Sequence, residues 1–99
     1  MTTYLIAQLQ INDRERYARY EAGFLDIFGR YDGKLLSVDE QPTVLEGEWP
    51  WTRTVLLEFP SRERALAWYE SEDYRALMTH RHAASEGNVV IIDGLPAAV

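Results

Sequence analysis

Hydrophobic and polar residues alternate along two segments of the chain. One face of residues 3–11 carries the apolar set Leu5, Ala7, Leu9 and Ile11. Residues 53–59 alternate in the same way, with Val55, Leu57 and Phe59 on one face. Because successive side chains of a strand point to opposite faces of a sheet, both segments are predicted to be β-strands. Pro60 cannot donate to a sheet ladder, so the second strand is expected to end before it.

Three other segments carry the spacing of amphipathic helices. Between a cap at Asn12-Asp13 and a stop at Asp32-Gly33, apolar residues recur every three or four positions: Tyr17, Tyr20, Phe24, Ile27 or Phe28, and Tyr31. Gly33 is expected to take the left-handed conformation there. Ser61 and Ser71 each precede a further helical segment, since their hydroxyls can accept from the first free amides of a helix. The aromatic pair Trp68-Tyr69 in the second helix is expected to belong to the core.

The remaining strands show weaker patterns. Residues 34–46 are predicted to form one long strand with a kink or bulge at Pro42, because apolar and β-branched residues occur on both sides of it. Residues 86–88 are expected to form a turn, and residues 88–93 the last strand. Residues 94–99 are expected to be a short, frayed tail.

The order strand, helix, strand, strand, helix, strand predicts an α+β fold, the ferredoxin-like βαββαβ arrangement, in a single domain spanning residues 1–99. Both helical regions would cover one face of a four-stranded antiparallel sheet. The opposite face would expose an apolar set: Tyr4, Ile6, Leu56, Val90 and Ile92. A monomer rarely leaves such a patch in water. We therefore expect a homodimer in which two open sheet faces pack together as a dimeric α/β barrel.

The composition limits the kinds of binding partner and chemistry that the protein can have. The formal net charge is −6, from sixteen acidic and ten basic residues, which argues against nucleic-acid binding through phosphate contacts. The absence of cysteine excludes disulfides and thiolate chemistry. No long apolar run and no signal-peptide pattern is present, so we expect a cytoplasmic protein that does not contact a membrane.

Several short motifs follow one another in a characteristic order: Glu46-Gly47-Glu48-Trp49, Leu57-Glu58-Phe59-Pro60-Ser61, Ala67-Trp68-Tyr69 with Ser71, then Tyr74, Arg81 and Asp93-Gly94. Together they resemble the domain-of-unknown-function 1330 family over essentially the whole chain. The resemblance implies membership of the dimeric α/β-barrel superfamily, whose two sheets form a barrel across the dimer axis. It implies no reaction, because that family is uncharacterised and its relatives include cofactor-free monooxygenases, isomerases, haem-binding enzymes and proteins without known activity.

Glu58 and His80 are the candidate catalytic residues. Glu58 is expected on the open face beside Leu56, and a carboxylate held among apolar groups has a raised pKa, which suits a general acid or base. The alternative is that Glu58 pairs with a basic residue and fixes the dimer register. His80 is a candidate base because histidine titrates near neutral pH, although a surface position near a helix end is the commoner reason for a histidine there.

Four residues are candidates for substrate binding. The guanidinium groups of Arg53 and Arg81 match a carboxylate bidentately, so either residue is expected to hold an anionic substrate or, alternatively, to pair with one of the many acidic residues. Trp49 and Tyr4 are candidates for the apolar wall of a pocket that takes a flat ligand. The alternative for Trp49 is a contact between subunits.

No metal or cofactor motif is present. His80 and His82 stand at i and i+2, so in a helix they point to nearly opposite sides and cannot share one ion. Neither a glycine-rich phosphate loop nor a nucleophile elbow occurs in the sequence. We therefore expect no bound metal and no cofactor of the usual kinds.

Three hypotheses for function remain. The first is a cofactor-independent enzyme that acts on a small apolar or aromatic molecule by acid/base chemistry. The second is a non-catalytic dimer that binds a metabolite in the same cavity. The third is a haem-handling protein, suggested by the histidines and the superfamily. The sequence names neither the ligand nor the assembly beyond a dimer.

Overall fold

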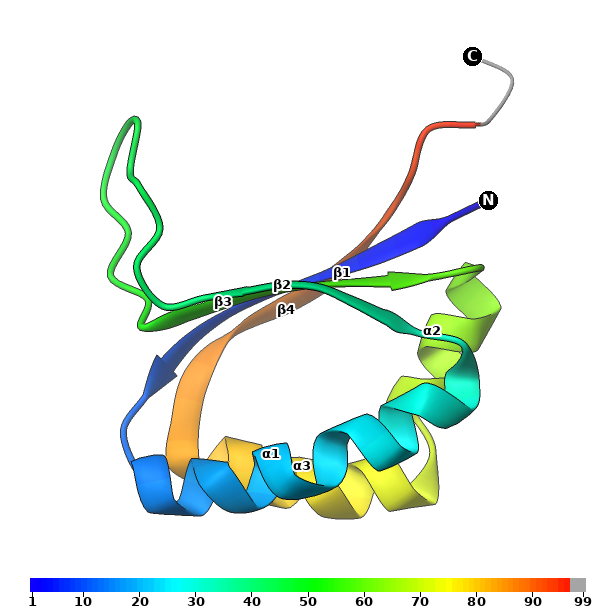
Figure 1. Cartoon of the computed structure of the whole chain (residues 1–99), viewed down its shortest axis with the longest axis horizontal. Helices are drawn as coiled ribbons and strands as arrows, with labels where there is room; N and C mark the ends of the chain where they lie inside the picture. The colour runs from blue at the N-terminus through cyan, green and yellow to red at the C-terminus, as the bar shows by residue number, and fades with distance from the viewer. Residues whose placement is uncertain (97–99) are drawn as a thin grey trace.

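The computed structural model describes residues 1–96 and forms one antiparallel sheet with helices on one of its faces (Figure 1). The sheet has the strand order β2-β3-β1-β4, from the strands β1 (Thr3–Ile11), β2 (Lys34–Asp39), β3 (Arg53–Phe59) and β4 (Ser85–Asp93). The helices are α1 (Arg14–Phe28), α2 (Arg62–Tyr69) and α3 (Glu72–Ala84), with a single 3-10 turn, η1 (Gly29–Tyr31), after α1. The predicted ferredoxin-like α+β fold is confirmed. Of the predicted tail 94–99, residues 97–99 lie outside the described residues.

All three α-helices begin at the predicted caps. Asp13 Oδ1 accepts from the Arg16 amide at 3.0 Å at the start of α1. The Ser61 and Ser71 hydroxyls each accept at 3.2 Å from an amide three residues further along, at the starts of α2 and α3. Each cap satisfies an amide that has no partner inside the helix. None of the helices among residues 1–96 has the length and apolar character required to cross a bilayer.

Two predicted strand boundaries are wrong. The strand predicted over residues 34–46 ends at Asp39, whose Oδ1 accepts from the Gln41 amide at 2.8 Å and turns the chain before Pro42 is reached. Its bulge lies between Leu35 and Ser37 instead. The last strand begins at Ser85 without the predicted turn, because β1 is long enough to pair with β4 over all nine of its residues.

Two glycines allow neighbouring atoms to approach the backbone closely, and neither is needed for a turn. Gly87 pairs opposite Leu9, and a Cβ there would overlap the backbone carbonyl oxygen of Gln8. At Gly33 a Cβ would overlap the ring of Phe28. The left-handed residue at the end of α1 and η1 is therefore Asp32, with φ 61°, and the prediction that Gly33 takes this role is wrong.

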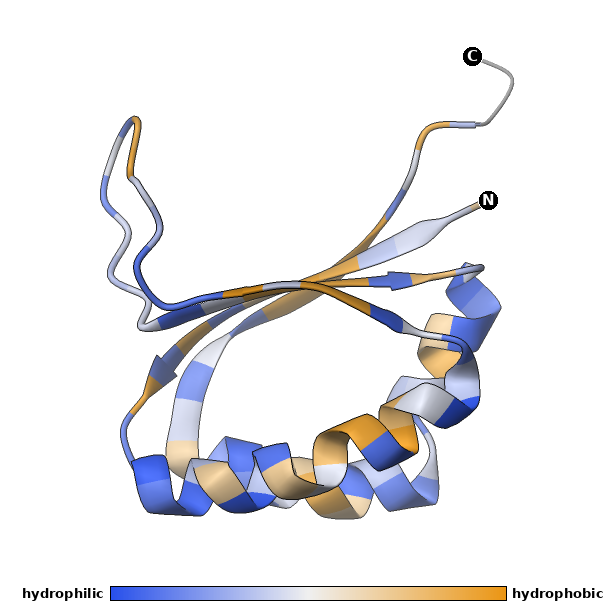
Figure 2. Ribbon diagram, viewed as in Figure 1, coloured by the Kyte–Doolittle hydropathy of each residue, from blue (hydrophilic) through white to orange (hydrophobic). Residues whose placement is uncertain are grey.

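The core lies between the helices and the covered face of the sheet. The apolar residues of β1 are buried and alternate with half-buried ones, as predicted. Trp68 of α2 is 1% exposed, and its ring lies within 6.0 Å, centroid to centroid, of those of Phe24, Phe28, Phe59, Tyr69 and Tyr74. Figure 2 shows hydrophobic segments in the middle of the strands and along the helices, broken by hydrophilic segments.

The other face of the sheet is uncovered. Ile6 stands opposite Leu56 and Val90 in the register, and Tyr4 stands opposite Glu58 and Ile92. Val90 and Ile92 are 51% and 47% exposed. The loop between β2 and β3 and the chain after β4 both rise on this side, away from the helices (Figure 1). The predicted open apolar face is therefore present.

Candidate functional site

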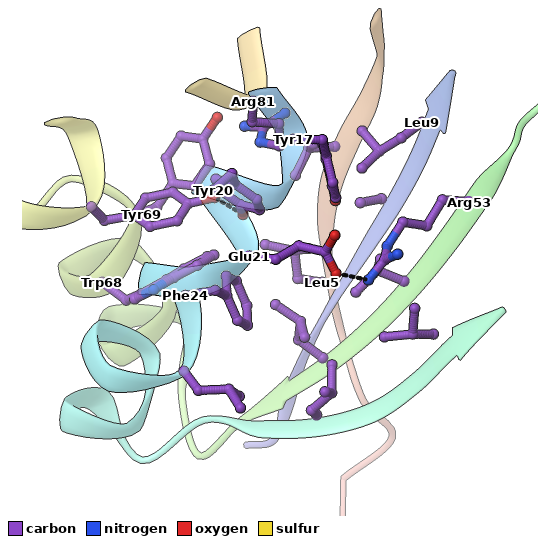
Figure 3. A pocket seen from close by; sticks show the side chains of 18 residues that line it. Leu5, Leu9, Tyr17, Tyr20, Glu21, Phe24, Arg53, Trp68, Tyr69 and Arg81 are labelled. Atoms are coloured by element: carbon purple, nitrogen blue, oxygen red, sulfur yellow. Dashed lines mark hydrogen bonds and ion pairs between the residues drawn. The ribbon is translucent and has the colours of Figure 1, made fainter. Parts of the chain in front are cut away.

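A cavity of about 170 Å³ lies between the helices and the covered face of the sheet (Figure 3). Its walls are mainly apolar and include Leu5, Ala7, Phe24, Val55, Leu57 and Trp68. Leu25 of α1 and Leu35 and Val38 of β2 also line it and are 39–63% exposed, so they mark its mouth. Because an apolar cavity of roughly 150 Å³ holds a benzene molecule, this one has room for a single-ring compound.

Four tyrosines line this cavity: Tyr17, Tyr20, Tyr69 and Tyr74. Tyr17 and Tyr20 reach it from α1 and Tyr74 from α3, and the Tyr20 and Tyr74 hydroxyl oxygens are hydrogen-bonded at 2.6 Å. Burial raises the pKa of Tyr17 to about 12, although the nearby charge of Arg53 acts in the opposite direction. Burial also raises the pKa values of Tyr20 and Tyr74. The phenols of Tyr17, Tyr20 and Tyr74 are therefore protonated, and able to donate, near neutral pH.

Two arginines line the cavity and differ in their partners. The Arg53 guanidinium lies 3.1 Å from Glu21 Oε2 and 3.8 Å from Glu40 Oε2, and over the Tyr17 ring at 5.3 Å. Arg81 is 7% exposed and lies over the Tyr20 ring at 5.9 Å. Among residues 1–96 no carboxylate oxygen lies within 4.0 Å of its guanidinium nitrogens. Within the described residues, Arg53 thus has carboxylate partners and Arg81 has none.

Glu21 is the one carboxylate that lines the cavity in the described part of the chain. It projects from α1 toward Arg53, as Figure 3 shows, and its side chain is 47% exposed. An acceptor for protons therefore stands at the mouth, next to the apolar space in which a ligand would lie.

The structure brings two of the predicted site residues together, Arg53 and Arg81. Glu58 lies on the open face, with Oε2 3.8 Å from Lys34 Nζ and a side chain 26% exposed. Tyr4 is its neighbour on the same face. Neither lines the cavity, which is on the other side of the sheet.

The other two predicted site residues also lie elsewhere. His80 Nδ1 accepts from Arg16 Nε at 2.9 Å, and the side chain borders an open depression over α1 and α3. Trp49 belongs to the loop between β2 and β3, where its indole N–H donates to Thr54 Oγ1 at 3.0 Å. In the part of the chain that the structure describes, no group of three or more His, Cys, Asp or Glu side chains lies close enough together to hold a metal ion.

Sequence reasoning missed Glu21 and the hydroxyls of Tyr17, Tyr20 and Tyr74. Tyr17 and Tyr20 were considered only as members of the apolar stripe of the first helix, and their hydroxyl groups were not weighed as polar groups of a site. Glu21 follows Tyr17 by four residues, so it lies on the same side of the helix. An acidic residue beside a stripe of tyrosines was the signal that could have found this site.

Residues 2–95 match the family described as "Domain of unknown function (DUF1330)", which confirms the resemblance seen in the sequence. No protein of curated function matches the chain.

Solved structures share the fold at low identity. A protein of unknown function from Rhodopseudomonas palustris is 19% identical, with a TM-score of 0.82 over 96% of this chain and 83% of that one. SnoaB, a cofactor-independent oxygenase from Streptomyces nogalater, is 7% identical, with a TM-score of 0.70 over 97% and 95%. A dimeric ferredoxin-like protein of unknown function from Thermobifida fusca is 12% identical, with a TM-score of 0.63 over 93% and 90%. At such identities the likeness concerns fold alone.

The buried phenols predict a loss of stability at alkaline pH. Because the folded pKa of Tyr17 is raised from 10 to about 12, its contribution to the free energy of unfolding is full below pH 10 and is lost as the pH rises toward 12. Urea unfolding measured between pH 10 and about pH 12 should show a smaller loss of the free energy of unfolding in Tyr17→Phe than in the parent. The control Tyr31→Phe, outside the cavity, should lose as much as the parent; an equal loss in Tyr17→Phe would contradict the assignment.

Proposed function

The chain belongs to the DUF1330 family, and we propose that it is a cofactor-independent enzyme that binds a small aromatic molecule between helices and sheet and moves a proton on it. The observation that carries this proposal is a cavity whose lining, in the described part of the chain, combines apolar surface, tyrosines and one carboxylate. Ligand sites of proteins commonly combine an apolar lining with a few polar groups in this way.

The walls favour a flat, largely apolar ligand. Phe24, Trp68 and Tyr69 contribute ring surfaces, and β1 and β3 contribute aliphatic side chains. Aromatic rings pack well edge-to-face against such surfaces. The volume of about 170 Å³ suits one ring with a small substituent.

Glu21 is the proposed base. In the proposed step an activated C–H bond of the bound ligand breaks, its proton passes to the Glu21 carboxylate, and the electron pair stays on the ligand as an enolate. Return of the proton to another position completes an isomerisation without any further reactant. Arg53, 3.1 Å from Glu21, orients the carboxylate at the mouth. Glu58 and His80 were the predicted acid/base residues, but both lie outside the cavity, so the proposal assigns the base to Glu21.

The similarity to SnoaB supports an enzyme without cofactor. That protein is a cofactor-independent oxygenase and shares this fold over 97% of the present chain. The fold is thus compatible with chemistry that needs no cofactor, although the reaction must be argued from each chain's own site.

A non-catalytic binder is the second candidate. The ion pair between Arg53 and Glu21 favours it, because a carboxylate held by a guanidinium is a weaker base than a free one. We do not extend the proposal to haem. The cavity has the size of a single ring, and His80 is already hydrogen-bonded to Arg16 outside it.

We also propose that two copies associate through their open sheet faces. The first support is the exposed apolar surface of Val90 and Ile92 on the open face. The second is the loop between β2 and β3, whose tip is hydrophobic (Figure 2) and whose Leu45 is 90% exposed. The Thermobifida fusca protein of this fold is described as dimeric. In such a dimer the pair of Glu58 with Lys34 would lie at the interface and help to set its register.

Filling the cavity tests whether it binds a ligand. In Ala7→Leu the added atoms point from β1 into the cavity, so binding of acetophenone, a single-ring ketone, should weaken at least about tenfold, the equivalent of roughly 1.4 kcal/mol. Thermal stability should stay the same or rise, since empty apolar space is filled. Titration followed by amide NMR shifts measures both binding and folding. Ala67→Leu, on the exposed side of α2, is the matched control, and equal binding by both variants would contradict the proposal.

Deuterium exchange distinguishes the enzyme from the binder. With saturating acetophenone in D₂O, the parent should speed exchange of the activated methyl protons, and Glu21→Gln should lower that rate by about 10²-fold or more while binding stays within a few-fold. Proton NMR of the ketone measures the exchange. If the parent binds the ketone and leaves its exchange at the solvent rate, the binder is the better description.

Placing a charge on the open face tests the dimer. Ile92→Asp should give a folded monomer or an aggregate, because a carboxylate cannot be buried unpaired between two apolar sheets. Sedimentation velocity measures the assembly. Leu66→Asp on α2, 39% exposed in the parent, is the control and should remain dimeric. An Ile92→Asp variant that stays dimeric with unchanged stability would show that the subunits meet elsewhere.

A further inference from the structure

We propose that the ligand of this cavity is an anion, a single-ring aromatic carboxylate, and that Arg81 is the residue that holds its charged group. This inference rests on the proposed function, because it assigns the ligand class of the same cavity. It differs from that proposal in what it requires, since a neutral ring would satisfy the proposed function alone.

The first argument is the cost of an unpaired buried charge. Arg81 is 7% exposed, and an arginine side chain stays protonated at every pH at which proteins fold. A buried cation is normally paired with a carboxylate, because its desolvation is otherwise uncompensated. The described chain offers Arg81 no such partner, although acidic residues outnumber basic ones sixteen to ten.

Arg53 provides the internal comparison. It lines the same cavity, and its side chain is 15% exposed, but two carboxylates, Glu21 and Glu40, lie within 4.0 Å of it. Among residues 1–96, Arg53 therefore has acidic partners and Arg81 has none. This asymmetry is expected if the missing anion arrives with the ligand.

The neighbours of Arg81 compensate its charge only in part. Arg81 is hydrogen-bonded to the Tyr74 side chain, and its guanidinium carbon lies 5.9 Å from the centre of the Tyr20 ring. Neither contact supplies a negative charge, and a contact with a ring face contributes modestly. Tyr20 and Tyr74 are neutral, since burial raises both of their pKa values. Among residues 1–96, no nearby group thus carries the full negative charge that a guanidinium can bind.

The tyrosine pair supplies a second contact for a carboxylate. Only one hydrogen can lie between the Tyr20 and Tyr74 oxygens, which are 2.6 Å apart, so the other hydroxyl hydrogen is free to donate elsewhere. Tyr74 and Arg81 are separated by seven residues of α3, about two turns, and so lie on the same side of that helix. A carboxylate beside this pair would accept from the guanidinium and from the free hydroxyl hydrogen, with its ring in the apolar part of the cavity.

A matched pair of ligands tests the charge. Benzoate and acetophenone have nearly the same shape and differ by an oxygen anion in place of a methyl group. The parent should bind benzoate at least about tenfold more tightly at neutral pH, the range expected for a charge-assisted hydrogen bond. Amide NMR titration of both compounds gives the two affinities and shows whether the cavity residues respond.

Variants of Arg81 test whether this residue causes the preference for benzoate over acetophenone. In Arg81→Gln the ratio of the two affinities should fall to about one, with acetophenone binding kept within a few-fold. Arg81→Lys retains the charge and should keep part of the preference while losing the bidentate geometry. Arg75→Gln, an exposed arginine on the same helix, is the control and should keep the ratio of the parent.

The outcomes test the inference about Arg81 and the proposed function separately. Benzoate preferred by the parent and not by Arg81→Gln supports the inference. Equal affinities in the parent overturn it and leave the proposed function standing, because the neutral ring still binds. Failure of both compounds to shift the cavity resonances overturns the proposed function, and the inference with it. If Arg81→Gln does not fold, the comparison in the parent and in Arg81→Lys still decides.

Discussion

The packing of Trp68 is the contact on which the rest of the structure depends. Its indole is almost fully buried between α1, β3 and α3, where it meets five other aromatic rings. These rings fill the space between sheet and helices at one end and hold α1 and α3 at a fixed distance from the strands. Further along β1 the residue facing the helices is Ala7, which is too small to reach across. The cavity is the space left between the rigid aromatic cluster and this small side chain.

The same arrangement explains why the cavity is polar on one side. Trp68 and Tyr74 are in contact, with ring centroids 4.1 Å apart, so the aromatic cluster ends in a phenol hydroxyl. That hydroxyl bonds to Tyr20 of α1, and Arg81 follows two turns later on α3. Aromatic packing therefore positions a buried donor pair beside a buried cation. In the proposed function, stability and ligand recognition would depend on the same residues, which would limit how freely either can change.

The sequence was informative wherever one residue decides a local structure. The serine and aspartate caps, the alternation in β1 and the end of β3 before Pro60 followed from local physics, and the fold followed from their order. The extents of β2 and β4 did not. β2 ends where Asp39 turns the chain, and β4 is as long as its partner β1 allows. Arg53 and Arg81 could be named as candidates, but which of them has carboxylate partners depends on contacts between residues far apart in the chain. Glu21 was missed because a helix surface position gives no sign of the cavity beside it.

The two faces of the sheet have different roles, and the central strands β1 and β3 contribute side chains to both faces. In β1 the odd-numbered residues line the core and the cavity, while Tyr4 and Ile6 point to the open face. In β3 Val55 lines the cavity and Leu56, the next residue, is opposite Ile6 on the open face. Because neighbouring side chains share one pleated backbone, a dimer formed on the open face would fix the geometry of the strands that form the cavity wall. In the proposed dimer, association therefore contributes to the rigidity of the ligand site without adding any residue to it.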